Sequence, residues 1–248
     1  GDADLVPGPR PAGQRAVARM SQRPDQTAVE RALFARRSVR AYTGAPVPRS
    51  DIERICRAAR QAPSGANLQP GSFHVLTGAA LTALSTALVA AIRDGTPVAC
   101  EYSYFPQPMP PELKARQRAA GYALYAALGI GRRDLDGRQA QFDQNYRFFG
   151  APVGVVVTID RRMGAGCFMD LGMALMAFQL AAADMGYATT GIGALANYGP
   201  VAHAHLDLPA DEMVVCGLAL GLADQDHPAN AFRTAREGVE SFTSFRGF

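Results

Sequence analysis

Two apolar segments in the second half of the chain constrain the fold more than any other feature. Val153 to Ile159 reads Val-Gly-Val-Val-Val-Thr-Ile, which is typical of a strand covered on both faces. Phe168 to Met185 follows, and few of its residues are suited to water: Asp170, Gln179 and Asp184. A helix that is apolar on nearly all sides is expected in the middle of a protein or in a subunit interface. The pair therefore predicts a central sheet strand and a central or interfacial helix.

Other parts of the chain carry shorter helix and strand patterns. A cap at Asp25 and a capping box that starts at Ser50 mark two helix starts. Val29, Leu33 and Phe34 recur at helical spacing after the first of them. The remaining expectations are helices at 81–92, 111–128 and 134–149, strands at 72–77 and 213–220, and a turn at 189–196.

The composition indicates an ordinary globular protein. Residues 1–24 are rich in Gly, Pro, Arg and Ala without an apolar period, so a flexible arm is expected there. Residues 25–248 are expected to form one domain, because 48% hydrophobic content supports a sizeable core. The net charge is only +3 and the basic residues are spread out, so no nucleic-acid partner is predicted.

A membrane partner is not predicted either. The apolar run from Leu171 to Ala183 is shorter than the roughly 20 residues that a membrane span needs. No charged and then apolar leader opens the chain, so a cytoplasmic location is expected.

Cysteine and histidine spacings give little support to a metal site. The four cysteines are scattered without a CxxC pair, which favours reduced thiols over disulfides or zinc ligands. His203 and His205 form a weak metal signal, and an exposed polar turn is the alternative. No metal is therefore expected.

Two basic clusters far apart in the sequence indicate one shared anion. Arg36, Arg37 and Arg40 surround Ser38, and the distant segment Asn230 to Arg236 repeats the pattern with Arg233, Thr234 and Arg236. Arginine grips phosphate with two parallel hydrogen bonds, so a phosphate-bearing cofactor is the hypothesis. Solvated surface arginines are the alternative.

A polar loop precedes the first predicted strand. It contains Pro63, Ser64, Asn67 and Gln69 among other turn formers. The two amides offer donors and acceptors to a planar heterocycle, and a simple surface turn is the alternative.

An aromatic insert rich in proline follows the helix expected at 81–92. Tyr102, Tyr104 and Phe105 in such a restrained segment are suited to wall a pocket for a flat organic substrate. Packing over a dimer surface is the alternative.

The segment Gly191-Ile192-Gly193-Ala194-Leu195-Ala196 fits the dinucleotide fingerprint G-x-G-x-x-G/A. The acid that should end a second strand, Asp211, instead precedes its predicted strand, and Asn197 to Pro200 breaks the helix that the motif requires. The glycines are better suited to bring backbone N–H groups close to a ligand.

In this order, the motifs resemble those of the FMN-dependent nitroreductase family, over nearly the whole chain from about Thr27 to Phe248. The resemblance is carried by Arg36-Arg37-Ser38-Val39-Arg40, by Pro63 to Pro70, by the strand after Ala151-Pro152 and by Asn230 to Arg236. Val214 to Gly221 and the terminal Phe245-Arg246-Gly247-Phe248 are similar to the nitrobenzoate-reductase-like branch. The resemblance to the family implies an α+β fold, with a central mixed sheet flanked by helices, in an intertwined homodimer.

The resemblance also implies a role for each motif. The FMN phosphate would be held by Arg36, Ser38, Arg233 and Arg236. Arg40 would lie near the pyrimidine edge of the flavin, where a cation stabilises the anionic reduced ring. Arg37 is included by its place in the motif alone. The isoalloxazine would be lined by Pro63, Ser64, Asn67 and Gln69, the first two from the partner subunit. The backbone donor to flavin N5 would come from Gly191, Ile192, Gly193 and Ala194.

The implied activity is hydride transfer from NAD(P)H through FMN to nitroaromatic or quinone-like acceptors. No side-chain catalyst is expected, because the flavin carries the redox chemistry. Two alternatives stay open: an FMN-dependent dehydrogenase or dehalogenase for a dedicated metabolite, and a non-enzymatic flavin-binding protein. Gly71 departs from the family, since an aromatic residue is common at that place.

Overall fold

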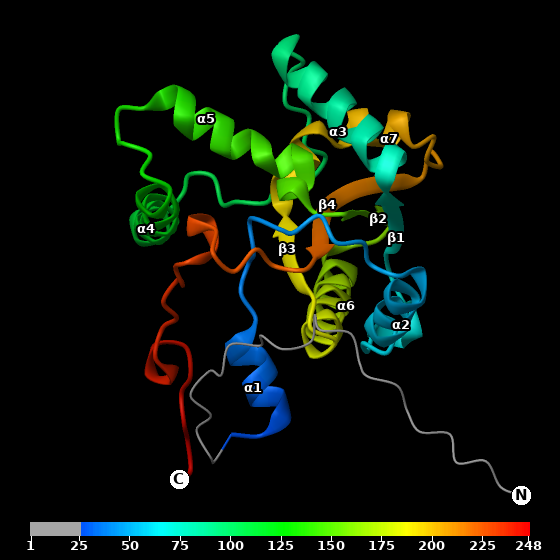
Figure 1. The fold of residues 1–248 in the computed structure, drawn as a ribbon. Helices are drawn as coiled ribbons and strands as arrows, with labels where there is room; N and C mark the ends of the chain where they lie inside the picture. The colour runs from blue at the N-terminus through cyan, green and yellow to red at the C-terminus, as the bar shows by residue number, and fades with distance from the viewer. Residues whose placement is uncertain (1–25) are drawn as a thin grey trace, which may run out of the picture.

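The fold is built on a four-stranded sheet. In the computed structural model, which describes residues 26–248, the strand order is β1 (Ser72–Thr77), β2 (Val153–Asp160), β4 (Glu212–Gly221), β3 (Ala188–Ile192) (Figure 1). The expected α+β class is confirmed. The sheet was expected to be mixed, but all of its ladders are antiparallel. Its parallel contribution within the described residues is one isolated bridge between Ser38 and Thr189.

The two inner strands are covered on both faces, which explains their continuous apolar sequences. All of β2 except its last residue is buried, and all of β4 except its first. Side chains alternate across the sheet, so Val153, Val155 and Val157 enter one core while Val156 enters the other. The strands predicted from these runs are confirmed.

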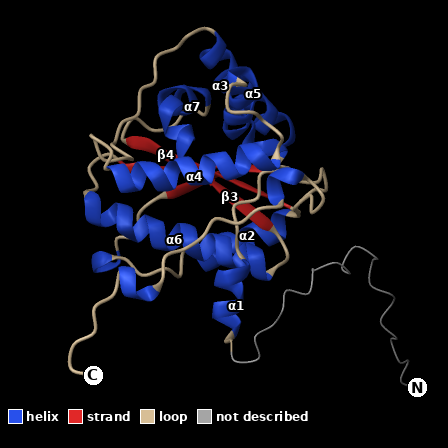
Figure 2. Cartoon of the chain, turned by 90° about the vertical axis from the view of Figure 1, so that its left-hand side faces the viewer, coloured by secondary structure: helices blue, strands red, loops and turns tan. Residues whose placement is uncertain are grey.

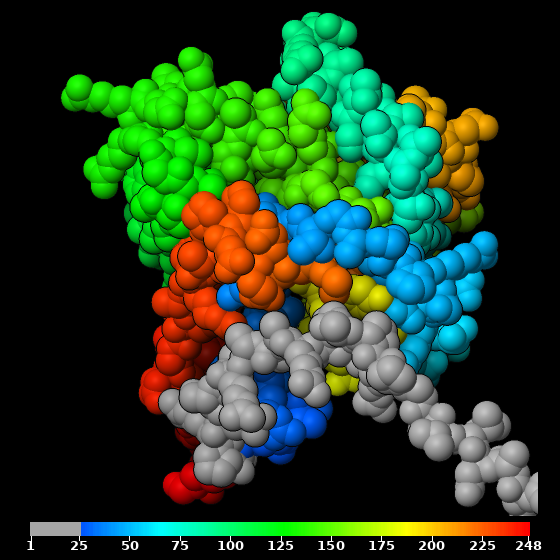
Figure 3. All heavy atoms as spheres, viewed as in Figure 1, coloured from blue at the N-terminus to red at the C-terminus, as the bar shows by residue number. Residues whose placement is uncertain are grey.

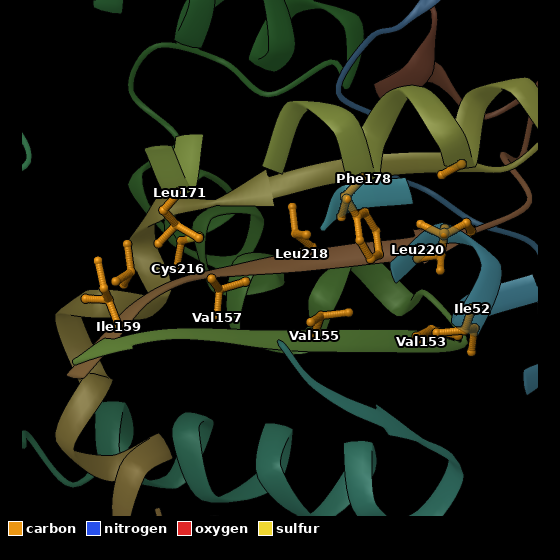
Figure 4. Close-up of a cluster of buried hydrophobic side chains, with 14 of the residues drawn as sticks. Ile52, Val153, Val155, Val157, Ile159, Leu171, Phe178, Cys216, Leu218 and Leu220 are labelled. Carbon is orange, nitrogen blue, oxygen red and sulfur yellow. The ribbon is translucent and has the colours of Figure 1, made fainter. Parts of the chain in front are cut away.

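Helices form a layer on each face of the sheet (Figure 2). The first core lies under α2 (Arg49–Ala59) and α6 (Ala165–Asp184), with Phe178 seated against β4 (Figure 4). The second lies under α3 (Gly78–Arg93) and α7 (Gly199–His205).

The central helix α6 confirms the strongest pattern in the sequence, but it is longer than the apolar run inside it. At 20 residues and a hydropathy of 1.5 it is long and apolar enough to cross a membrane, a test that the core helix of a soluble protein also passes. Leu171, Ala174, Phe178 and Ala182 are its buried residues. Much of the remaining apolar surface is uncovered in a single chain.

The helix starts differ from those expected. Asp25 lies outside the described residues, and α1 (Ala28–Ala35) begins behind Thr27, which forms a complete capping box with Glu30. No capping box forms at Ser50, because α2 already begins at Arg49 after Pro48. The predicted arm at 1–24 also lies outside the described residues.

Two further helices, α4 (Pro111–Ala127) and α5 (Leu135–Asp143), have no buried residues. The helix expected at 134–149 was predicted too long. It gives way to a 3-10 segment in which Phe148 and Phe149, both buried, adopt left-handed backbone at φ 49° and 54°. The turn expected at 189–196 was also wrong at its start, where β3 lies.

Candidate functional site

The two basic clusters of the sequence meet at one cavity of about 410 Å³. Figure 3 shows the C-terminal segment, in orange and red, lying against the N-terminal segment in blue. We call this cavity the arginine cavity; its polar lining is Arg36, Arg37, Ser38, Arg40, Arg233, Thr234 and Arg236, and its apolar lining is Leu33, Phe34, Met176 and Phe232. The convergence predicted from charge alone is therefore present within a single chain.

The first cluster is fixed by the edge of the sheet. Ser38 pairs in parallel with Thr189, and the Val39 N–H donates to the Thr189 carbonyl at 3.2 Å. The Thr190 hydroxyl donates to the Val39 carbonyl. This segment thus extends the sheet beside β3, while α1 ends immediately before it at Ala35.

The second cluster is tied to the first by Asn230, which is only 2% exposed. Its amide oxygen accepts from the Arg40 N–H at 2.7 Å. Its amide nitrogen donates to the carbonyls of Ala41 at 2.9 Å and of Asp224 at 2.8 Å. The sequence placed Asn230 at the start of the motif but gave its side chain no role.

Electrostatics at the cavity favour an anion. Burial lowers the pKa of Arg36, and the nearby cations Arg236 and Arg233 lower it further. Burial also lowers the pKa of Arg37 and of Arg40. Within residues 26–248, no ion pair joins Arg36, Arg37, Arg40 or Arg236 to a carboxylate. Like charges held together in a half-buried cavity are stabilised by a bound anion.

Several arginines are held by neutral groups. Arg233 donates to the carbonyls of Phe34 at 2.7 Å and Ala35 at 3.2 Å, and so caps the C-terminus of α1. Arg236 donates to the Thr234 hydroxyl at 2.8 Å. Arg37 donates to the Gln225 side chain at 3.2 Å, which is the first structural role that can be given to it.

The glycine segment lies at the end of β3 and in the turn after it. Gly191 and Ile192 are the last residues of β3, and Gly193 and Ala194 begin a 3-10 turn. Gly191 is exposed, with open space where a Cβ would lie, whereas Ile192 is buried in the core. Because Thr190 contacts Val39, the strand brings Gly191 near the arginine segment.

The aromatic insert lies over the end of this segment. A Cβ on Gly193 would come within 3.0 Å of the Tyr104 ring. That ring packs edge-on against Phe105, with 4.8 Å between the two ring centroids. Tyr102 is anchored by its hydroxyl, which donates to the Val215 carbonyl at 2.6 Å. The proposed pocket residues Tyr102, Tyr104 and Phe105 are thus adjacent to the glycine segment.

The polar loop lies apart from the arginine cavity and is not among its lining residues. Pro63, Ser64 and Gln69 instead line a small separate hollow with Asp170 and Ala174 of α6. The Gly65 N–H donates to Asp170 at 3.0 Å, and the Gln69 N–H donates to the Ser64 hydroxyl at 2.9 Å. Asn67 and Gln69 adopt positive φ, at 57° and 48°. The loop is anchored to α6, and Pro63, Asn67 and Gln69 are exposed in the single chain.

The two histidines of the weak metal signal lie outside the arginine cavity. His203 and His205 lie on the short helix α7, not in a turn, and His203 contacts the Pro209 carbonyl at 2.9 Å. Residues 26–248 contain no cluster of three or more His, Cys, Asp or Glu residues that could hold a metal.

Comparison with known proteins agrees with this architecture. A protein-family model described as the nitroreductase family matches residues 33–222. The chain belongs to the nitroreductase family. The chloronitrobenzene nitroreductase of Comamonas testosteroni is 38% identical over 212 residues, which are 85% of this chain and 93% of that protein. The 4-nitrobenzoate reductase of Pseudomonas putida is 36% identical over 216 residues, 87% and 94% of the two chains.

Solved structures give the same result. The FMN and NADPH-dependent nitroreductase NfnB of Sphigopyxis sp. strain HMH is 39% identical, with a TM-score of 0.87 over 90% of this chain and all of that one. The family and the nitrobenzoate-reductase-like resemblance predicted from the motifs are confirmed.

Some wall residues of this nitroreductase were not predicted as parts of a site. Leu33 and Phe34 were predicted only as part of a helix, yet they line the arginine cavity together with Met176. Thr190 was assigned to a turn. The available signal was its position directly before the glycine segment. If that position is read as part of a strand, the Thr190 hydroxyl can bond to the backbone of an adjacent segment.

Proposed function

We propose that this nitroreductase binds FMN and transfers hydride from NAD(P)H to nitroaromatic or quinone-like acceptors. The observation that carries the proposal is the arginine cavity, where cations from both ends of the sequence converge without carboxylate partners for Arg36, Arg40 and Arg236 among the described residues. The relatives named above are nitroreductases of chloronitrobenzene and nitrobenzoate, and the similar solved structure is FMN and NADPH-dependent.

The donor set of the cavity fits the phosphate of FMN. A guanidinium group only donates hydrogen bonds, and a hydroxyl can donate one. Phosphate oxygens accept them, so every contact can be a charge-assisted hydrogen bond. Arg36, Ser38, Arg233 and Arg236 would hold the phosphate. Arg40, farther along the edge segment beside β3, would face the flavin ring; it is half-buried, which strengthens its field.

The bound FMN would supply the redox chemistry, accepting hydride and passing electrons on. The chain supplies position and exclusion of water. Gly191, Ile192, Gly193 and Ala194 would present backbone N–H groups to the ring, and the exposed Gly191 leaves room for close approach. Tyr102, Tyr104 and Phe105 would wall the space in which nicotinamide and then acceptor stack on the ring.

A homodimer completes the proposed site. Apolar side chains stay exposed on two helices that contact each other: Val29 and Phe34 are each 62% exposed on α1, and Met169 is 71% exposed on α6. Such a surface is typical of an interface between copies. In this arrangement Pro63 and Ser64 would reach the flavin of the partner subunit, with Asn67 and Gln69 on the same loop. A soluble, cytoplasmic dimer is proposed.

The decisive experiment compares FMN with riboflavin, which lacks the phosphate. Purified protein is incubated with each flavin, desalted and scanned for flavin absorbance, then mixed with NADH or NADPH and with nitrobenzoate or a quinone. We expect retention of FMN, weak retention of riboflavin, and bleaching by a nicotinamide that an acceptor reverses. The Arg36→Met and Arg236→Met variants should lose the preference for FMN over riboflavin. Protein that stays colourless with excess FMN would refute the proposal.

A further inference from the structure

One peptide group at the arginine cavity is held from both sides by buried side chains. The peptide joins Val39 to Arg40. Its carbonyl accepts from the Thr190 hydroxyl, and its N–H donates to the Asn230 amide oxygen at 2.7 Å. Since a trans peptide points these two groups in opposite directions, Thr190 and Asn230 grip it from opposite sides. We call this arrangement the peptide clamp.

The two side chains of the clamp belong to a small set of buried polar residues. Among the described residues, the buried polar or charged residues are Thr158, Thr189, Thr190 and Asn230. Thr190 and Asn230 are 1% and 2% exposed, so a broken bond there would leave a polar atom without water. Asn230 also donates to Ala41 and Asp224, which fixes its amide and leaves its oxygen aimed at Arg40. The clamp is therefore stiff.

The clamp joins three parts of the site. Thr190 immediately precedes Gly191, and Asn230 stands three residues before Arg233 and six before Arg236. The gripped peptide carries Arg40 itself. Burial and mutual repulsion both act to push the arginines of this cavity apart or into water, as the lowered pKa of Arg36 indicates. A fixed peptide opposes that movement before any anion arrives.

We infer that Thr190 and Asn230 are positioning residues, which hold Arg40, the glycine segment and the C-terminal arginines in one register so that a flavin phosphate and ring are met by preset donors. This inference rests on the proposed function for the identity of the ligand. Neither side chain touches the reacting atoms; each acts through the peptide of Arg40.

The test replaces Thr190 by Val, which keeps the shape and removes the hydroxyl. Thr158→Val is the matched control, because Thr158 is also fully buried on a strand and its hydroxyl donates to Glu212, away from the cavity. We expect Thr190→Val to weaken FMN binding about threefold to tenfold, the effect of one buried hydrogen bond. Thr190→Ser should restore binding, and Thr158→Val should lower stability without changing FMN affinity.

Two readouts separate positioning from simple loss of stability. The reduction potential of bound FMN should fall in Thr190→Val, because Arg40 is then held less firmly at the ring, and should stay unchanged in Thr158→Val. In the protein without FMN, the Arg40 amide should be protected from hydrogen exchange in the wild type and exchange faster in Thr190→Val. Thr190→Ala, which also removes the hydroxyl but adds no methyl group in its place, serves as a second variant if the first does not fold.

The outcomes are distinguishable from those of the proposed function. Wild-type protein that binds no FMN refutes the function, and a rapidly exchanging Arg40 amide refutes the clamp with or without FMN. If FMN affinity and potential are the same in the wild type and in Thr190→Val, the clamp has no positioning role.

Discussion

Gly71 gives the sharpest quantitative test of the packing around the site. Its φ is +89°, a backbone conformation that residues other than glycine rarely adopt. A Cβ placed there would lie 2.4 Å from the Leu171 side chain and 3.3 Å from the Thr158 carbonyl. Leu171 is 1% exposed, so it has little space to move. With this backbone and with Leu171 in place, a side chain at position 71 would not fit without displacing its neighbours.

The expected cost of Gly71→Ala has two parts. The positive φ costs roughly 1–2 kcal/mol, and forcing a methyl group into a filled core costs about 1–3 kcal/mol more. The sum is about 2–5 kcal/mol of unfolding free energy. For a chain of this size, 1 kcal/mol moves Tm by roughly 2–4 °C. We therefore expect a fall in Tm of roughly 4–20 °C.

Gly186→Ala is the matched control. Gly186 has a similar φ of +84° but nothing within 4 Å of its Cβ position. It should lose only the conformational part, about 1–2 kcal/mol. Thermal and urea unfolding of the protein without flavin measure both variants. Equal losses in the two would show that contact with Leu171 does not limit this position, and the packing argument would be refuted.

Gly71→Ala should also act on the polar loop. Arg60 donates to the Gly71 carbonyl at 2.7 Å and also to the carbonyl of Gln69. A displaced Gly71 is thereby coupled to Gln69, one of the residues proposed to line the flavin. FMN affinity should fall in Gly71→Ala and stay unchanged in Gly186→Ala.

Three further predictions concern other elements. Phe178→Ala removes a ring that is 0% exposed in the first core and should cost about 3–5 kcal/mol in urea unfolding. Tyr102→Phe loses the 2.6 Å bond to the Val215 carbonyl, about 1 kcal/mol, and should raise the KM for the acceptor while FMN affinity stays the same. Arg162 lowers the pKa of Asp160 from 3.8 to about 2, so the ionised carboxylate stabilises the fold above about pH 4 and this contribution is lost as the pH falls towards 2. Tm measured against pH should fall less steeply on the acid side in Asp160→Asn, and an unchanged profile would contradict the assignment.

The parts of the fold that were predictable are those whose sequence is set by burial on both faces. Val153 to Ile159 has no polar face to leave open, so only an inner strand suits it. By contrast β3 is an edge strand of five residues with two threonines and a glycine, a composition that a turn shares. Its strand state comes from pairing with β4 and with Ser38, which are distant in the sequence. A local sequence pattern does not predict pairing with segments that are distant in the sequence.

The site shows the same division. Charge predicted the meeting of Arg36 with Arg233 and Arg236, because both clusters place arginines beside a hydroxyl donor and one phosphate can be shared between them. The means of that meeting were not predictable. Asn230 looks like any polar turn residue in the sequence, and only its burial and its three hydrogen bonds reveal that it joins the two clusters. A polar side chain acquires such a role from its surroundings, not from its type.

The separation of the polar loop from the arginine cavity favours a dimer in which each of two flavin sites is formed by residues of both subunits. Both contact α6, the loop through Asp170 and Ala174 and the cavity through Met176. With 3.6 residues per turn, Ala174 and Met176 point roughly 160° apart around the helix. A phosphate in the arginine cavity would therefore lie on roughly the opposite side of α6 from the loop of its own chain. If the loop contacts flavin as proposed, we expect that flavin to belong to a second copy, which would pack on the exposed apolar surface of α6.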